Sequence, residues 1–292
     1  AENEDLREVY WRFYLKHPAD WEGHGADKLT RATILLPAAY DEDGNQIRAN
    51  WSQAMIAHVW SGSPGSPRQY LLNLDPASGT DPEGNVVSTK YNDFDNLRWL
   101  GLAEGKTPIF DAEHVGEWYA VEVHVKLNDP GVSNGVFELW INDELEAGIY
   151  DLNWVGEFQE YGINAIFIEN YWNSGSVKAQ ERYFDNLVIS RSKIGLAVMD
   201  MQDGFNELAR LTAEIEHPGA KQAISARIET AQRFFEKAAE FDPGSQQAAH
   251  FTAKGYEALQ KAADKIEGYG ENHLDPSIRS RLLDTIDIML QL

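Results

Sequence analysis

The chain has 292 residues, of which 43% are hydrophobic and 25% charged, a composition typical of folded globular proteins. Its 47 acidic residues outnumber its 25 lysines and arginines, and a formal net charge of −22 disfavours nucleic acid as a partner. Cysteine is absent, which excludes disulfides, thiol catalysis and cysteine–zinc sites. No run of about 18 apolar residues occurs, so the sequence predicts no membrane span.

From the N-terminus to about residue 194, short segments alternate between polar and apolar residues, which predicts antiparallel β-strands. Clusters rich in Gly, Pro, Asp and Asn separate these segments, as hairpin turns do. The clusters read DEDGN, SGSPGSP, DPASG, DPEGN and NDPGVSNG. All nine tryptophans lie between Trp11 and Trp172, and we expect one β domain over residues 1–194.

Alternation within each predicted strand separates an inward side from an outward side. The inward side chains are apolar, and they are Val9, Trp11, Phe13, Leu15, Tyr119, Val121, Val123, Val125, Leu127, Phe137, Leu139, Ile141, Ile166 and Ile168. The outward side chains are largely aromatic or charged, and they include Tyr10, Arg12, Tyr14, Lys16, Glu122, His124, Lys126, Glu138, Trp140, Phe167, Glu169 and Tyr171. In the predicted strand AMIAHVW, one side carries Ile56, His58 and Trp60. In the predicted strand KLTRATIL, one side carries Leu29, Arg31 and Thr33.

After residue 194 the apolar residues recur with the period of a helix, and helix breakers are few. One stripe within 221–241 contains Ile224, Ile228, Ala231, Phe235 and Ala238. Breaks at HPG, DPGS and GYGENHLDPS predict about four helices. We therefore expect a C-terminal α-helical bundle over residues 195–292, whose aromatic residues form its core.

The outward faces of the β domain combine aromatic rings with charged groups, unlike an ordinary solvated surface. Rings stack on the apolar faces of sugars, and charged or amide groups bind their hydroxyls and carboxylates. We interpret the set as a polysaccharide groove on one concave sheet, and the candidate substrate-binding residues are Trp60, Trp140, Glu169, Glu138, Lys126, Arg12 and Tyr14. The alternative is that several of these aromatics fill a second core layer.

The stretch from Trp118 to Ile194 resembles the jelly-roll polysaccharide lyases of the concanavalin A-like group, especially the glucuronan-lyase and alginate-lyase-like branches. The resemblance rests on WYAVEVHVKLN, VFELWIN, YGINAIFIENYWNSGS and RYFDNLVISRSKIG, and it extends to the opening EVYWRFYLKHPADWE and KLTRATILLP. It implies an all-β jelly roll, a concanavalin A-like β-sandwich, over most of residues 5–195. It also implies a lyase that cleaves a uronic-acid-containing polysaccharide by β-elimination.

Such an elimination needs a base for the C5 proton, an acid for the leaving oxygen and a donor at the substrate carboxylate. The resemblance points to Tyr171, at the edge of an NSG loop, and to His58 as proton-transfer residues. Arg31, Arg12 and Lys126 are candidate neutralising cations, and His124 is a second candidate base. Two features depart from the family pattern. Glu169 stands where an amide is typical, and alternation places Gln53 and His58 on opposite faces of the sheet.

Two other functions fit the same residues. Glu122, Glu138 and Glu169 could form the carboxylate pair of a glycoside hydrolase, one as acid and one as nucleophile or base. Otherwise Glu122 and Glu138 belong to a structural ion network. A third hypothesis needs no chemistry, since the β domain could be a lectin-like module that only binds glycan.

A structural calcium ion is a further expectation, with Asp185 and Asn186 near the end of the β domain as ligands. The acidic residues Glu2, Glu4, Asp5 and Glu8 would add oxygen ligands, whereas the alternative for Asp185 is a hydrogen-bonded turn. No histidine pair has zinc spacing, and the chemistry requires no cofactor. The glycan-type face and the opening AENEDLREVY, which resembles a processed end, favour a secreted or cell-surface protein.

Overall fold

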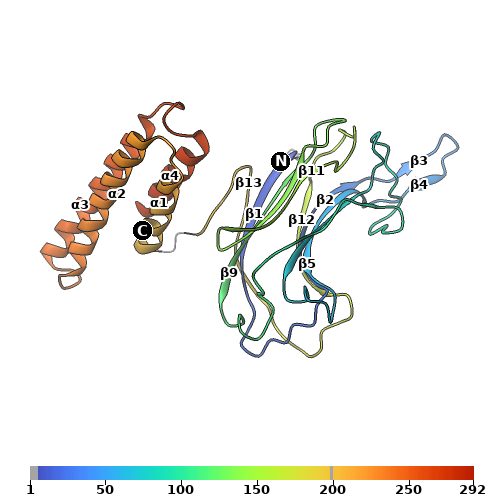
Figure 1. Cartoon of the computed structure of the whole chain (residues 1–292), viewed down its shortest axis with the longest axis horizontal. Coiled ribbons are helices and arrows are strands. Elements are labelled where there is room, and N and C mark those ends of the chain that lie inside the picture. Colours follow the sequence, from blue (N-terminus) through green and yellow to red (C-terminus); the bar gives the residue numbers. More distant parts are fainter. Residues whose placement is uncertain (1–5, 198–199) are drawn as a thin grey trace. The chain divides into compact units, whose positions relative to one another are not determined.

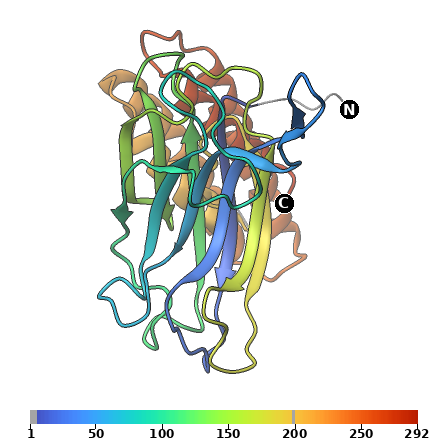
Figure 2. The ribbon, with the colours of Figure 1, turned by 90° about the vertical axis from the view of Figure 1, so that its right-hand side faces the viewer.

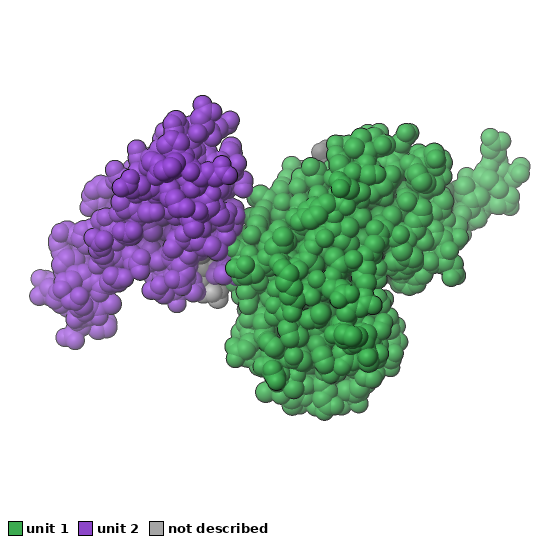
Figure 3. All heavy atoms as spheres, in the orientation of Figure 1, with its two compact units in different colours: residues 1–195 green, residues 196–292 purple. Residues whose placement is uncertain are grey.

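The computed structural model describes residues 6–197 and 200–292, and the chain divides into two compact units, Ala1–Gly195 and Leu196–Leu292 (Figure 3). The first unit consists of antiparallel strands and the second of four helices (Figure 1). No helix among the residues that the structure describes is long and apolar enough to cross a membrane.

Two antiparallel sheets form a sandwich-like arrangement in the first unit. The first sheet has the strand order β11 (Glu144–Leu152), β10 (Gly135–Ile141), β9 (Trp118–Lys126), β1 (Glu8–Lys16) and β13 (Tyr183–Ser190). The second sheet has the order β12 (Ala165–Trp172), β2 (Asp27–Leu36), β5 (Ser52–Ser61), β6 (Leu72–Ser78) and β7 (Arg98–Trp99), and β8 (Ala103–Glu104) also pairs with β6. A separate hairpin joins β3 (Ala39–Tyr40) to β4 (Gln46–Arg48).

One hydrophobic core lies between the two sheets and receives side chains from both. The inward residues predicted for β1, β9 and β10 all belong to this core, because alternation along these strands places every second side chain inside. Trp11, Phe13 and Phe137 are among its largest fully buried members. The outward faces of the two sheets consequently point in opposite directions.

Three β-bulges interrupt the alternation in the second sheet, where β12 lies beside β2 (Figure 2). The pairing shifts between Lys28 and Thr30 of β2, and β12 shifts against β2 between Ile168 and Tyr171. A bulge lets two consecutive residues face the same side, which the predicted alternation does not anticipate. The expectation that Leu29 shares the face of Arg31 is therefore wrong, since Leu29 lies in the core.

The second unit contains α1 (Met201–Ala213), α2 (Pro218–Ala239), α3 (Gln246–Glu267) and α4 (Pro276–Met289). Each helix begins at a side chain that accepts a backbone N–H, and these capping residues are Asp200, His217, Ser245 and Asp275. The predicted stripe of α2 is confirmed, since Ile224, Ile228 and Ala231 are buried in one core with residues of the other three helices.

Candidate functional site

The predicted site residues are divided between the two sheets. Arg31, His58, Trp60, Glu169 and Tyr171 belong to the second sheet. The first sheet carries the others, namely Arg12, Tyr14, His124, Lys126, Glu138 and Trp140. The prediction of one groove that carries the whole set is therefore wrong. Alternation identifies the two sides of a strand, but it does not identify the sheet that the strand joins.

A cavity of about 490 Å³ opens on the outward face of the second sheet. Strands β2 and β12 and the segment before β7 supply its lining, which consists of Lys28, Arg31, Tyr91, Asn92, Phe94, Glu169, Asn170, Tyr171 and Asn173. Arg31, Glu169 and Tyr171 were predicted, whereas His58 and Trp60 are not among the lining residues. Cations, phenols and amides meet here, so this cavity is the candidate site.

The guanidinium of Arg31 is held by three groups of the cavity. Its Nη1 donates a hydrogen bond to Asn92 Oδ1 at 3.0 Å, and its Nη2 donates to the Tyr91 hydroxyl. The same Nη2 lies 3.3 Å from Glu169 Oε1. Arg31 is thus a fixed cation whose charge is largely balanced by Glu169.

Glu169 also faces His58, whose Nε2 lies 3.4 Å from Glu169 Oε2. Burial raises the pKa of Glu169, but adjacent His58 and the cations Arg31 and Lys28 outweigh it, so the pKa lies below its usual value. Burial lowers the pKa of His58 more than the carboxylate raises it. His58 is a buried residue that stacks on Trp60, with ring centroids 5.4 Å apart. It positions Glu169 and does not face the cavity as the predicted base.

Lys28 is a cation of the site that the alternation pattern does not identify. Its Nζ lies 5.2 Å from the ring centroid of Tyr171 and 5.9 Å from that of Phe94. Burial lowers the pKa of Lys28, while Glu169 raises it and Arg31 lowers it further. The bulge at Leu29 turns Lys28 toward the cavity, and a local sequence pattern carries no signal for this bulge.

Gln53 lies on the same face as His58, contrary to the prediction. A bulge in β5 places Ala54 and Met55 together in the core, so Gln53 points outward. Gln53 Nε2 donates to Thr33 Oγ1 at 3.2 Å, and its Oε1 accepts from the backbone N–H of Asn92 at 2.9 Å. Gln53 therefore holds Asn92, whose φ of +53° is uncommon for a non-glycine residue, where it meets Arg31.

A buried arginine behind the cavity holds the backbone of two site residues. Arg182 Nη1 donates to the carbonyl oxygens of Lys28 at 3.2 Å and Glu169 at 3.3 Å. Its Nε donates to His17 Nε2 at 3.0 Å. Because both carbonyls belong to the bulged stretches of β2 and β12, Arg182 stabilises the backbone from which the two charged side chains project.

Burial shifts the ionisation of this buried cluster. Burial lowers the pKa of His17 to about 3, and the neighbouring Arg182 lowers it too. Burial raises the pKa of Asp27 to about 6, although Arg182 and Ser61 oppose the rise. Burial lowers the pKa of Arg182 to about 10. His17 is consequently a neutral acceptor for the arginine at neutral pH.

Predicted site residues of the first sheet bind neighbouring side chains of the same sheet. His124 lies between two carboxylates, with Nδ1 2.8 Å from Glu138 Oε2 and Nε2 2.9 Å from Glu8 Oε1. Its ring stacks on Tyr10 at 4.0 Å. Tyr150 donates to the other oxygen of Glu138. His124 therefore belongs to a structural hydrogen-bonded network, and the prediction that it serves the same site as Tyr171 is wrong.

The end of the first unit covers the outward face of the first sheet. Glu122 accepts hydrogen bonds from the backbone N–H groups of Ile194 at 2.6 Å and Gly195 at 2.8 Å. Arg12 Nη1 donates to Gly195 O at 3.4 Å, so Arg12 and Glu122 are both buried. Burial raises the pKa of Glu122 despite these hydrogen bonds. The predicted neutralising role of Arg12 at the site of Tyr171 is thereby excluded.

The carboxylate pair expected for a hydrolase is not assembled. Glu122 and Glu138 lie on the first sheet, on the opposite side of the sandwich from Glu169. Glu169 is the one carboxylate among the described residues that line the cavity. A two-carboxylate mechanism needs both groups across one substrate, so the hydrolase hypothesis loses its geometric basis.

Asp185 lies within strand β13, where the pairing with β1 shifts, so the alternative of a turn before the last strand is wrong. Asp185 Oδ1 accepts the backbone N–H of Asn186 at 2.7 Å, and Glu8 is bound to His124. No group of three or more metal-ligating side chains occurs among residues 6–197 and 200–292. Glu2, Glu4 and Asp5 lie outside the described residues, and calcium binding stays a prediction of the sequence.

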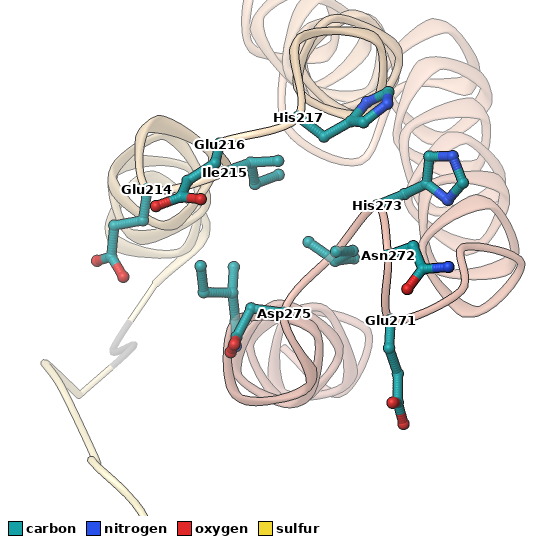
Figure 4. A pocket seen from close by; sticks show the side chains of 10 residues that line it. Glu214, Ile215, Glu216, His217, Glu271, Asn272, His273 and Asp275 are labelled. Carbon is teal, nitrogen blue, oxygen red and sulfur yellow. The ribbon is translucent and has the colours of Figure 1, made fainter.

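The helical unit has a cavity of its own, about 320 Å³ in volume, at the loops that precede α2 and α4 (Figure 4). His217 and His273 approach there, with ring centroids 4.6 Å apart, but both side chains are exposed and His217 caps α2. In Figure 4 the carboxylates of Glu214 and Glu271 stand on opposite sides of the opening and do not converge. This cavity therefore offers no assembled chemical site.

Solved structures similar to this chain include polysaccharide lyases, as the sequence resemblance indicates, and also the CBM40 domain of a Ruminococcus gnavus sialidase. A variant of alginate lyase Aly36B in complex with alginate tetrasaccharide has 16% identity and a TM-score of 0.41 over 67% of this chain and 73% of that one. Alginate lyase vAL-1 from Chlorella virus has 11% identity and a TM-score of 0.42, over 64% and 72%. Endo-β-1,4-glucuronan lyase from the fungus Trichoderma reesei has 13% identity and a TM-score of 0.40, over 63% and 68%.

No family model matches the sequence, and a search of curated proteins gives no match. The structural likenesses lie below 25% identity and below a TM-score of 0.5, so they carry no argument about individual residues.

Proposed function

We propose that the first unit is a polysaccharide lyase with a jelly-roll fold that cleaves a uronic-acid-containing glycan by β-elimination. The observation that carries this proposal is the cavity beside Tyr171, where Glu169 pairs with Arg31 and, among the described residues, no carboxylate forms an ion pair with Lys28. A pocket with one such cation, several amides and a phenol suits a single sugar carboxylate and the proton transfers next to it.

The residues divide the reaction between them. Lys28 and the amides of Asn92 and Asn170 bind the substrate carboxylate and stabilise the negative charge that develops as the C5 proton leaves. Tyr171 transfers the proton, since its side chain is 55% exposed and lines the cavity. The electron pair of the broken C5–H bond forms the C4–C5 double bond, and the C4–O bond breaks. Tyr171 passes the proton that it accepts from C5 to the leaving oxygen, so the products are an unsaturated sugar and a new chain end.

The pairing of Glu169 removes an objection to this site. An isolated carboxylate would repel the substrate, but Glu169 is held by Arg31 and His58 and acts inside the protein as a counter-charge. Arg31 in turn orients Tyr91 and Asn92 at the rim of the cavity. Arg31, Glu169 and His58 are therefore positioning residues in this mechanism.

A lectin-like module is the second candidate, because exposed aromatic rings surround the same cavity. Tyr91, Phe94 and Tyr171 each expose more than a third of their surface, which suits sugar stacking without any reaction. Under this alternative the cavity binds uronate and leaves the glycan intact.

One assay separates the candidates. The full chain is incubated with glucuronan, alginate and neutral glucans, and both reducing ends and the ultraviolet absorbance of the unsaturated product are followed. A lyase raises both signals. Reducing ends without that absorbance indicate hydrolysis, and binding without either signal indicates the lectin-like module.

We also propose that the protein is secreted or displayed on the cell surface, where polysaccharides of this class are accessible. Recovery of the protein from the culture medium or from intact cells by surface labelling supports this location. A protein found only after cell lysis contradicts it.

A further inference from the structure

Two exposed aromatic rings extend the candidate site across the second sheet. Phe94 lines the cavity, and its ring is stacked with that of Trp99, with centroids 6.1 Å apart and planes 20° apart. Phe94 is 42% exposed and Trp99 is 51% exposed. Lys28 Nζ lies 5.9 Å from the Phe94 ring, so the cation, Phe94 and Trp99 follow one another outward from the cavity.

The segment that carries these two exposed rings also contributes a buried residue. Leu97, two residues before Trp99, is buried against Ile56 and Ala77. Trp99 pairs with Ala77 at the edge strand β7, and yet its ring remains half exposed. Adjacent large exposed rings are uncommon on an ordinary solvated surface and often mark a binding surface. We call Phe94 and Trp99 the aromatic platform.

The charges around the aromatic platform differ from those in the cavity. Arg98 is turned away, since its guanidinium donates to Thr80 O and Ser78 Oγ. Asp95 is exposed between the two rings in sequence, and Asp93 is bound by Thr89 and Asn96. Lys90 is exposed beside Tyr91, at the other end of this segment. The cations that line the cavity are Lys28 and Arg31, and Trp99 is not among the lining residues.

An aromatic face attracts C–H groups and cations and repels anions, because its π-system carries negative charge above the ring. The C–H-rich face of a neutral sugar therefore suits the aromatic platform, whereas a second carboxylate over the rings would be unfavourable. A homopolymer of uronic acids presents a carboxylate on every sugar. The cavity balances one such carboxylate, and the platform next to it balances none.

We infer that Phe94 and Trp99 form a subsite for a neutral sugar next to the uronate subsite, so that the preferred substrate is a heteropolysaccharide in which a uronic acid adjoins a neutral sugar. This inference rests on the proposed function for the identity of the uronate subsite. The aromatic platform then determines the preference for such a heteropolysaccharide over a homopolymer of uronic acids.

The test measures binding of the full chain by titration calorimetry, under conditions in which turnover is followed separately. The probes are tetrasaccharides of glucuronan and alginate as homopolymers. Hyaluronan and unsulfated chondroitin tetrasaccharides serve as heteropolymers, in which uronate alternates with a neutral N-acetylhexosamine. The variants are Phe94→Ala and Trp99→Ala, and the matched control is Trp118→Ala, a similarly exposed tryptophan on the first sheet.

We expect at least one heteropolymer to bind more tightly than both homopolymers. Trp99→Ala should weaken that heteropolymer about tenfold and leave the homopolymers nearly unchanged, as expected when one ring contact is lost outside the cavity. Phe94→Ala should weaken the heteropolymer more than the homopolymers, because Phe94 also lines the cavity beside Lys28. Trp118→Ala should change neither. Homopolymers that bind as tightly as every heteropolymer, or platform variants that leave heteropolymer binding intact, overturn the inference. Platform-dependent binding with no elimination product supports the subsite and overturns only the proposed lyase reaction.

Discussion

Glu169 Oε2 lies 3.4 Å from His58 Nε2 while its other oxygen lies 3.3 Å from Arg31, so one carboxylate serves a histidine and an arginine at once. The pKa values of Glu169 and His58 both lie below their usual values, so at neutral pH the carboxylate is ionised and the imidazole is neutral. The charge of Arg31 is thereby balanced within the protein. Lys28 is left as the cation of the cavity that can respond to a substrate.

Glu169→Gln should move the basic limb of the pH profile of KM to lower pH. Lys28 must be protonated to bind the substrate carboxylate, burial already lowers its pKa, and Glu169 is the group that raises it. Removing that charge makes Lys28 lose its proton earlier as the pH rises. Steady-state kinetics from pH 6 upward measures the limb. Glu138→Gln on the first sheet is the control, and an unmoved limb in Glu169→Gln excludes Lys28 as the ionising group.

Tyr171→Phe should lower kcat by about 10²-fold or more, the scale for losing a positioned proton-transfer group. Binding and thermal stability should change by about 1 kcal/mol at most, because the hydroxyl faces a wet cavity and the ring is kept. Tyr183→Phe, at an exposed tyrosine of β13, is the control and should retain activity. Full elimination activity in Tyr171→Phe excludes Tyr171 from the proton transfer.

Asp27→Asn should make the protein more sensitive to acid. The pKa of Asp27 is about 6 in the folded protein and 3.8, its ordinary value, in the unfolded chain. Between these two values the folded protein binds the proton and the unfolded chain does not, so Asp27 stabilises the folded protein increasingly as the pH falls from about 6 to about 4. His17 acts in the opposite direction, because the unfolded ring binds a proton below 6.5 and the folded ring binds one only near 3. The two slopes oppose each other in the natural chain.

Asp27→Asn leaves the His17 effect uncompensated. Relative to the natural chain, its free energy of unfolding should fall by about 1.4 kcal/mol per pH unit between about pH 6 and pH 4. Urea unfolding at several pH values measures this difference, in which the other titrating groups cancel. Asp185→Asn, at an exposed position of β13, serves as the control. Parallel stability profiles for Asp27→Asn and the natural chain would show that Asp27 does not carry the shift.

Limited proteolysis should leave an N-terminal fragment that ends after Gly195. The amides of Ile194 and Gly195 are bound to the buried Glu122 carboxylate, which holds this stretch in the first unit. In Glu122→Ala these hydrogen bonds are lost, and cuts within 190–195 should appear. Mass spectrometry of the fragments locates the cuts, and thermal melting of the variant checks that it is still folded. Cuts before Ile194 in the natural chain contradict this assignment.

Strands with unbroken alternation were predictable residue by residue. The inward residues of β1, including Trp11 and Phe13, follow directly from hydrophobic periodicity, and so does the buried stripe of α2. The placement of Tyr171 beside Arg31 and Glu169 on one face was also correct, because each lies on the outward side of its strand. These features depend on neighbours in the sequence.

The rest depends on partners that lie far along the chain. His124 and His58 have the same kind of local pattern, but they belong to different sheets because their strands pair with different neighbours. Arg182 is separated from its acceptor His17 by 165 residues, and no motif marks either of them. Lys28 depends on a shift in pairing between β2 and β5. Strand pairing and register are tertiary choices that periodicity alone does not contain.

The extra residue in β2 also governs how this chain can be aligned with other β-sandwich proteins. The equivalent strand of another protein that lacks the bulge is one residue shorter between the positions of Lys28 and Thr30. A correct alignment therefore requires a single-residue gap within that stretch. An ungapped alignment matches Lys28 to an inward, apolar column and removes the cation from the comparison. Insertions and deletions of one residue can therefore create or abolish this charge in the cavity, as a substitution of Lys28 itself does.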